Sequence, residues 1–236
     1  MESPVQDTIE SRVQSVLAKI RSAAEKAGRS ASNVRLVAAT KTVPVQKIAE
    51  GVQAGLAILG ENRVQEALSK IPAFKPVPVQ WHFIGQLQRR KVRSVIGVFE
   101  LIHSVDSREL ALEIDRRAGD AGHRQDVLLE VNIGNEPTKA GFCPDDVRQA
   151  VSELAQLSHI RIKGLMAIPP PTIDPDSARP YFRKLTELAR MVDAQHLPSV
   201  KMDELSMGMS NDYEVAIEEG ATLVRVGSAI FGARHV

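Results

Sequence analysis

The sequence is poor in cysteine, in aromatic residues and in charge of one sign. Among its 236 residues it has one cysteine, Cys143, so no internal disulfide can form and a reducing compartment is expected. A formal net charge of +1 argues against nucleic acid or an anionic membrane as a partner. No apolar run approaches the length of a membrane span, and the acidic N-terminus lacks an apolar signal core. These absences predict a soluble cytoplasmic protein.

The segments that are present alternate between apolar runs typical of buried strands and amphipathic runs typical of helices. Eight such strand–helix units in roughly 250 residues have the size of a closed (β/α)8 barrel. An open doubly wound sheet is the alternative, disfavoured because no GxGxxG follows the first strand. We therefore predict a single domain over 1–236, a (β/α)8 TIM barrel with an extra N-terminal helix, in which 1–33 pack on the barrel. The predicted strands are 34–40, 56–59, 80–84, 100–104, 127–133, 162–168, 204–207 and 222–226.

Helices are predicted between these strands from apolar spacing and from their end signals. The proline-rich stretch PPPTIDPDSARP is expected to be a mobile loop. The predicted helices are 7–27, 44–54, 109–118, 144–157, 181–195 and 211–219, with further helix starts after Gly85 and near Ser228.

Lys41 ends the first predicted strand in the segment LVAATKT, and Pro44 suits the first turn of the next helix. In α/β folds, active sites lie where a strand ends and the chain continues toward the next helix. A lysine that is desolvated there can form a Schiff base, although this needs a pKa about three units below its usual value of about 10.4. From this segment alone, a lysine that caps a strand and reaches into solvent is the favoured interpretation, so the case for chemistry depends on the rest of the chain.

Glycine and serine precede a helix after the last two predicted strands, in SMGMSND and VGSAIFG. Helix N-termini bind phosphate readily, and barrels often bind it in the loops after strands seven and eight. The alternative is that these residues are ordinary helix caps and turns. The candidate phosphate-binding residues are Ser206, Gly208, Met209, Ser210, Gly227 and Ser228.

Arg225 lies in the otherwise apolar eighth strand, so an inward guanidinium would need a carboxylate or the ring nitrogen of a cofactor as its partner. Other polar residues are expected at the barrel rim, namely Asn62, His82, His103 and Asn132. His82 lies in an apolar segment, so it also fits a hydrogen-bonded histidine of the core. No cluster has metal-ligand spacing, so no metal is expected. The basic run 88–93 is interpreted as a solvated helix face, since no aromatic platform accompanies it.

With these features in place, the chain resembles the pyridoxal 5′-phosphate homeostasis protein family, small relatives of the alanine racemase N-terminal barrel. The resemblance runs nearly end to end, through LVAATKT, GENRVQE, WHFIGQLQ, EVNIGNEPTKAG, GLMAIPP and LSMGMSNDYEVAIEEGATLVRVGSAIFG. It implies a barrel that holds pyridoxal 5′-phosphate as a Schiff base on Lys41. It also implies that Arg225 faces the pyridine nitrogen. The remaining implied cofactor contacts are Asn62, His82, Met166, Ser206, Gly208, Met209, Ser210, Gly227 and Ser228.

The expected function is therefore a non-catalytic carrier that maintains the intracellular supply of pyridoxal phosphate and can deliver it to apoenzymes, as a monomer or weak dimer. An arginine at the ring nitrogen weakens the ring as an electron sink. The racemases that the chain resembles have a second domain and a tyrosine base, neither of which is visible before Val236. A racemase or lyase that uses Lys41 as base is the alternative. A Schiff-base aldolase acting on a sugar phosphate is a third possibility.

Overall fold

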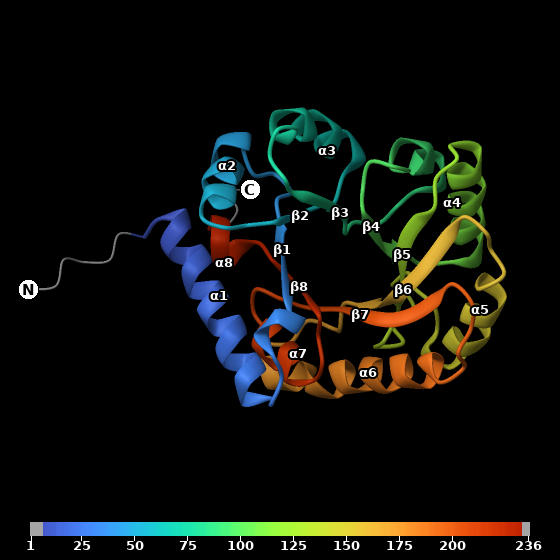
Figure 1. Cartoon of the computed structure of the whole chain (residues 1–236). Coiled ribbons are helices and arrows are strands. Elements are labelled where there is room, and N and C mark those ends of the chain that lie inside the picture. Colours follow the sequence, from blue (N-terminus) through green and yellow to red (C-terminus); the bar gives the residue numbers. More distant parts are fainter. Residues whose placement is uncertain (1–6, 233–236) are drawn as a thin grey trace, which may run out of the picture.

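Eight parallel strands form a closed barrel in the computed structural model, which describes residues 7–232 (Figure 1). The strands follow one another around the barrel in sequence order, and β1 pairs with β8 to close it. The predicted single-domain (β/α)8 fold is confirmed. The strands are β1 (Arg35–Ala39), β2 (Ile58–Glu61), β3 (Gln80–Phe83), β4 (Leu101–Val105), β5 (Gln125–Val131), β6 (Ile160–Ala167), β7 (Val200–Met209) and β8 (Leu223–Val226).

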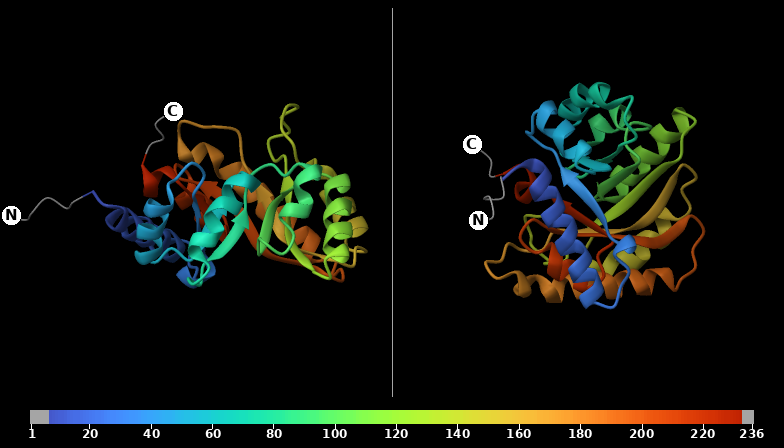
Figure 2. Two further views of the ribbon diagram at one scale, coloured as in Figure 1. Left: turned by 90° about the horizontal axis from the view of Figure 1, so that it is seen from above. Right: turned by 60° about the vertical axis from the view of Figure 1, so that its left-hand side comes forward.

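Helices surround the barrel, and α1 packs across its outside against α2, α7 and α8 (Figure 2). The α-helices are α1 (Ile9–Lys26), α2 (Val45–Gln53), α3 (Val64–Lys70), α4 (Arg108–Asp120), α5 (Val147–Leu154), α6 (Arg179–Asp193), α7 (Tyr213–Glu218) and α8 (Ser228–Phe231). The 3-10 helices are η1 (Ala31–Asn33), η2 (Ile71–Phe74), η3 (Arg89–Ser94), η4 (Pro144–Asp146) and η5 (Pro175–Ala178).

Helix α1 shows how local sequence sets an element and its packing. Thr8 caps its N-terminus in a capping box with Ser11, which satisfies backbone amides that the first turn leaves unpaired. Its buried residues recur at helical spacing, and Gly28 follows with a φ of +66°, a conformation that favours glycine. The predicted N-terminal helix on the barrel is therefore present; residues 1–6 of the predicted 1–33 segment lie outside the described residues.

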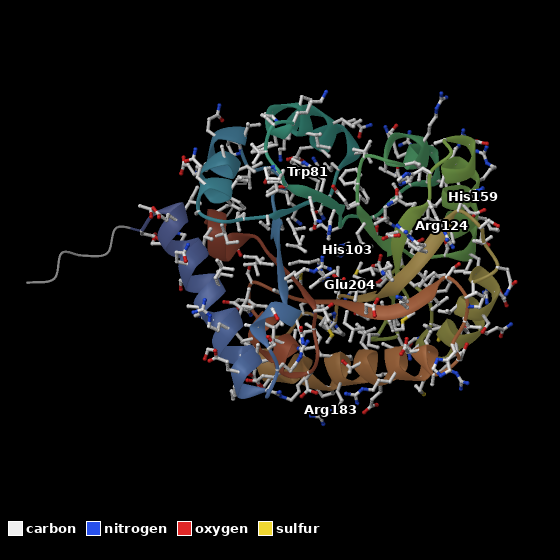
Figure 3. All side chains as sticks on the ribbon, in the orientation of Figure 1. Trp81, His103, Arg124, His159, Arg183 and Glu204 are labelled. Carbon is white, nitrogen blue, oxygen red and sulfur yellow. The ribbon has the colours of Figure 1, made fainter. Side chains whose placement is uncertain are left out.

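The barrel interior has an apolar part and a polar part. The apolar cluster has one residue from each of β1, β2, β4, β5, β6 and β8 and one just after β3: Val37, Ile58, Leu101, Leu128, Met166, Leu223 and Ile84. Four buried polar side chains fill the interior as well: His82, His103, Ser206 and Arg225. Figure 3 shows His103 in the middle of the barrel. Because inward side chains of parallel strands pack in layers, these four residues from distant parts of the sequence meet.

The main differences from the prediction concern four elements: α3, β7, η3 and η5. Helix α3 was not predicted, since it is one short segment in which only Val64, Ala67 and Lys70 are buried. Strand β7 begins at Val200 and includes Gly208; its first half alternates between partly buried and exposed residues rather than forming an apolar run. The basic run forms 3-10 helix η3, and part of the proline-rich stretch forms η5 ahead of α6.

Candidate functional site

Lys41 lies at the carboxyl end of β1, on the rim of a pocket at the seam between β1 and β8. The residue after it, Thr42, has a φ of +62°, a left-handed conformation that is costly for a β-branched residue. The chain therefore turns sharply at Lys41 and leaves the barrel toward α2. The pocket lining includes Lys41, Thr42, Pro44, Lys47, Gly227 and Ser228.

The predicted phosphate-binding residues divide into two groups. The Ser210 Oγ accepts hydrogen bonds from the backbone amides of Gly227 (3.2 Å) and Ala229 (3.5 Å) at the start of α8. These bonds place Ser210 close to the seam pocket. Gly227 and Ser228 line the pocket itself. The structure thus brings Lys41 together with the serine–glycine start of α8.

The other three lie in β7, below or beside this rim. The Met209 amide donates to the Asp212 carboxylate at 2.6 Å, so it already has an acceptor. Gly208 has a φ of +86°, and a Cβ added there would lie 2.6 Å from the Cβ of Ala216 in α7. Ser206 is fully buried inside the barrel. The structure does not place Ser206 on the loop where the sequence analysis expected it.

Arg225 reaches across the barrel interior. Its Nη1 donates to the Ser206 hydroxyl at 2.5 Å and its Nη2 donates to the Ala167 carbonyl at 3.1 Å. Burial lowers the pKa of Arg225 to about 10, while the nearby Glu130 and Asp212 carboxylates oppose this shift. The guanidinium is therefore charged at neutral pH, and these two hydrogen bonds hold it against β6 and β7.

Two buried histidines extend this chain of hydrogen bonds. His103 Nδ1 lies 2.8 Å from Ser206 Oγ, and His103 Nε2 lies 2.9 Å from His82 Nδ1. Burial lowers the pKa of His82 to about 3, and burial together with His82 and Arg225 lowers that of His103 well below its usual range. Both rings are neutral, and Ser206 already accepts a hydrogen bond from Arg225. One arrangement then satisfies both histidine contacts: the Ser206 hydroxyl donates to His103 Nδ1, and His103 Nε2–H donates to His82 Nδ1.

The position of His103 corrects its expected place at the rim, whereas His82 matches the alternative of a hydrogen-bonded core histidine. His82 and His103 lie inside the barrel, 2% and 0% exposed, because β3 and β4 continue past them. Asn132, also expected at the rim, organises the loop after β5. Its side chain bonds to the backbone of Glu136 and Lys139.

A second pocket opens at the same end of the barrel, across β2 to β6, and it contains the remaining two predicted contacts, Asn62 and Met166. The Asn62 side-chain oxygen is buried and has no hydrogen-bond partner among the described residues. Glu130 and Lys139 also line this pocket. An unpaired buried acceptor at the mouth is a position at which a ligand can donate a hydrogen bond.

Glu130 is a residue that the sequence analysis missed. Burial, and secondarily the Asp106 carboxylate, raise its pKa to about 7, although Arg225 and Lys139 oppose the shift. The signal was present, since Glu130 is the one charged residue in the apolar segment LLEVNI. Perturbed carboxyl groups of this kind occur frequently in functional sites.

Within the part of the chain that the structure describes, no group of histidine, cysteine, aspartate and glutamate side chains could hold a metal ion. Across the same residues, 7–232, none of the helices is both long and apolar enough to cross a membrane.

Comparison with known proteins places this geometry in a family. The family model "Alanine racemase, N-terminal domain" matches residues 13–235. The pyridoxal phosphate homeostasis protein of Aquifex aeolicus is 47% identical over 223 residues, which cover 94% of this chain and 97% of that protein. The crystal structure of a protein of unknown function from Bifidobacterium adolescentis has a TM-score of 0.90 at 39% identity, and covers 94% of each chain.

The structure of PipY from Synechococcus elongatus with pyridoxal phosphate bound is also similar. Its TM-score is 0.83 at 36% identity, and the match covers 95% of this chain and all of that one. The family-model match, residues 13–235, includes both Lys41 and the α8 segment. The chain belongs to the alanine racemase N-terminal domain family and, within it, to the pyridoxal phosphate homeostasis proteins.

Proposed function

We propose that this protein binds pyridoxal 5′-phosphate, retains it as a Schiff base on Lys41, and maintains the intracellular supply of this cofactor without catalysing a reaction of its own. The observation that carries the proposal is the seam pocket, in which the Lys41 side chain and the glycine–serine start of α8 line one cavity. A homologous protein whose structure contains the cofactor, and relatives named for its homeostasis, support it.

The chain's own residues fit the group. Pyridoxal phosphate supplies an aldehyde that a lysine amine captures reversibly, together with a phosphate dianion and a pyridine ring. Ser210, Gly227 and Ser228 supply hydroxyl and amide groups at the rim for the phosphate. The proposed contacts to the ring are Asn62 and Met166, at the second pocket, and Arg225, anchored by Ser206 and Ala167.

The buried chain of His82, His103 and Ser206 has a supporting role in this proposal. Ser206 accepts from Arg225 and contacts His103, so it fixes where the guanidinium lies rather than meeting the phosphate directly. A cation held at the pyridine nitrogen keeps that nitrogen unprotonated, which weakens the ring as an electron sink. Arg225 thereby favours storage of the cofactor over chemistry on it.

The tyrosines give no evident base for a racemase. Tyr213 is buried at the start of α7, and burial raises its pKa to about 12. Tyr181, the other tyrosine of the sequence, is partly buried on α6 beside the proline-rich segment. We therefore favour a carrier that works in the cytoplasm, where the exposed thiol of Cys143 stays reduced, and that can pass its cofactor to apoenzymes.

The decisive experiment is an absorbance spectrum of the purified protein mixed with pyridoxal phosphate, followed by borohydride reduction and peptide mass mapping. We expect a near-visible band and a reduced pyridoxyl adduct on Lys41. No band and no adduct would contradict the proposal, and trapping only with a ketose phosphate would favour an aldolase. Exchange of the α-proton of alanine with deuterated solvent, at a rate above that of free cofactor, would favour a racemase instead.

A further inference from the structure

A buried lysine outside both pockets, together with a neighbouring glutamate, holds the backbone on either side of Lys41. Lys70, the last residue of α3, is 6% exposed, and its Nζ donates to three oxygens at 2.7 Å each. The acceptors are the Thr40 carbonyl, the Glu61 carboxylate and the Glu66 carboxylate. An ammonium has three protons, so all of its donors are used.

Two of these acceptors lead directly to the peptide units that flank Lys41. Lys70 binds the carbonyl of Thr40, the residue before it. The Glu66 oxygen that Lys70 contacts also accepts the backbone amide of Thr42, the residue after it, at 2.5 Å. Lys41 is therefore bracketed by a closed ring of contacts through Lys70 and Glu66.

This ring of contacts holds the chain where its backbone conformation is strained. Thr42 has a φ of +62°, and such a conformation persists only where surrounding contacts enforce it. The Thr40 hydroxyl adds a bond to Glu61 at 2.7 Å, which ties the end of β1 to the end of β2. Lys41 thus projects from a turn that is closed by the local bond from the Val43 amide to the Thr40 carbonyl (3.0 Å) and is held from outside by Lys70 and Glu66.

The charges of the cluster are unusual for a purely stabilising contact. Burial raises the pKa of Glu61 against the hydrogen bonds from Lys70 and Thr40, and one of its oxygens is buried without a partner among the described residues. Glu66 behaves oppositely: burial is outweighed by bonds from Lys70 and Thr42, and its pKa is lowered. Buried ion pairs contribute little net stability compared with apolar residues. The main effect of this cluster is therefore to fix the positions of the groups that it binds.

We propose that Lys70, together with Glu66, is a positioning residue that sets the direction from which the Lys41 amine enters the cofactor pocket. This inference rests on the proposed function, since it concerns the same lysine. Removing the ring should leave the phosphate-binding residues of α8 in place and misdirect only the amine. Attachment to Lys41 should suffer while non-covalent binding does not.

The test compares two ligands that differ only at the reacting carbon. Pyridoxal phosphate can attach to Lys41, whereas pyridoxine 5′-phosphate carries an alcohol there and cannot. For Lys70→Met we expect the rate of attachment, followed by absorbance and by borohydride-trapped adduct on Lys41, to fall about tenfold or more, since misplacement by about 1 Å can cost that much. The dissociation constant for pyridoxine phosphate should stay within about twofold of wild type. Lys26→Met, which removes an ion pair with Glu218 on the outside of the barrel, is the matched control and should change neither.

Glu66 supplies a second pair of variants that keeps the Lys70–Glu61 contact. Glu66→Ala removes the acceptor for the Thr42 amide and should slow attachment, whereas Glu66→Gln keeps an oxygen there and should restore most of the rate. Unchanged attachment in Lys70→Met and Glu66→Ala would overturn the proposal, and so would equal weakening of both ligands. If Lys70→Met fails to fold, the two Glu66 variants decide. Failure of the wild-type protein to attach pyridoxal phosphate would instead overturn the proposed function.

Discussion

Glu130→Gln should stabilise the cofactor-free protein at alkaline pH and lose that advantage at acidic pH. Glu130 lies partly buried at the barrel mouth, and burial with the nearby Asp106 carboxylate raises its pKa from 4.5 to about 7. The folded protein therefore holds this proton more tightly than the unfolded chain. The resulting stability is fully present below about pH 4.5 and is lost as the pH rises through about 7.

The magnitude follows from the shift. About 2.5 pKa units at about 1.36 kcal/mol each give about 3.4 kcal/mol as an upper value, and partial access to water reduces it. Glutamine does not titrate. The difference in unfolding free energy between Glu130→Gln and wild type should therefore rise by about 2 kcal/mol in favour of the variant between pH 5 and pH 8.

Urea unfolding at several pH values measures this difference. Trp81, the only tryptophan, is buried against Phe74 and reports unfolding by fluorescence. Glu109→Gln, at an exposed position on α4, is the control variant. A difference for Glu130→Gln that stays flat between pH 5 and pH 8, or that changes with the opposite sign, would refute the reasoning.

Three further predictions follow from single contacts. Ser210→Ala removes the acceptor of two backbone amides at the start of α8. Titration should show about tenfold weaker binding of pyridoxine phosphate, because a hydrogen bond involving a charged group contributes about 1.5–3 kcal/mol. Wild-type affinity would contradict the phosphate assignment. Lys41→Ala should lose the absorbance band and the trapped adduct yet still bind the cofactor through its phosphate, so an equally yellow variant would rule out Lys41 as the attachment point. Gly164→Ala should lower the unfolding free energy by about 3 kcal/mol or more, because its φ is +154° and a Cβ would lie 1.8 Å from the Glu204 carbonyl oxygen. Gly97→Ala, with a φ of +71° and nothing near its Cβ, should cost only about 1 kcal/mol in the same urea titration.

The architecture was predictable because its signals are local. Buried parallel strands are short apolar runs, and their helices carry apolar residues at helical spacing, so the order of elements can be read along the chain. The weak points were elements without such a signal. Helix α3 has three buried positions in seven residues, and the first half of β7 alternates between partly buried and exposed residues.

The candidate site was predictable in part for the same reason. Lys41 and the segment from Gly227 carry their signals in sequence, as a polar residue at a strand end and a glycine–serine helix start. Their meeting follows from barrel closure, in which β1 pairs with β8. Glu130 could have been found as a charge inside an apolar strand.

By itself, the sequence determined the order of the eight strands, the lysine that follows the first, and the glycine and serine residues that begin the last helix. Only the tertiary structure decided that His82, His103, Ser206 and Arg225 form one buried chain. It also decided that Lys70 and Glu66 together bind the backbone on the two sides of Lys41. The physical reason is the range of the interactions. Periodicity and end signals act over one element, whereas inward side chains meet according to the register of strands that are distant in sequence.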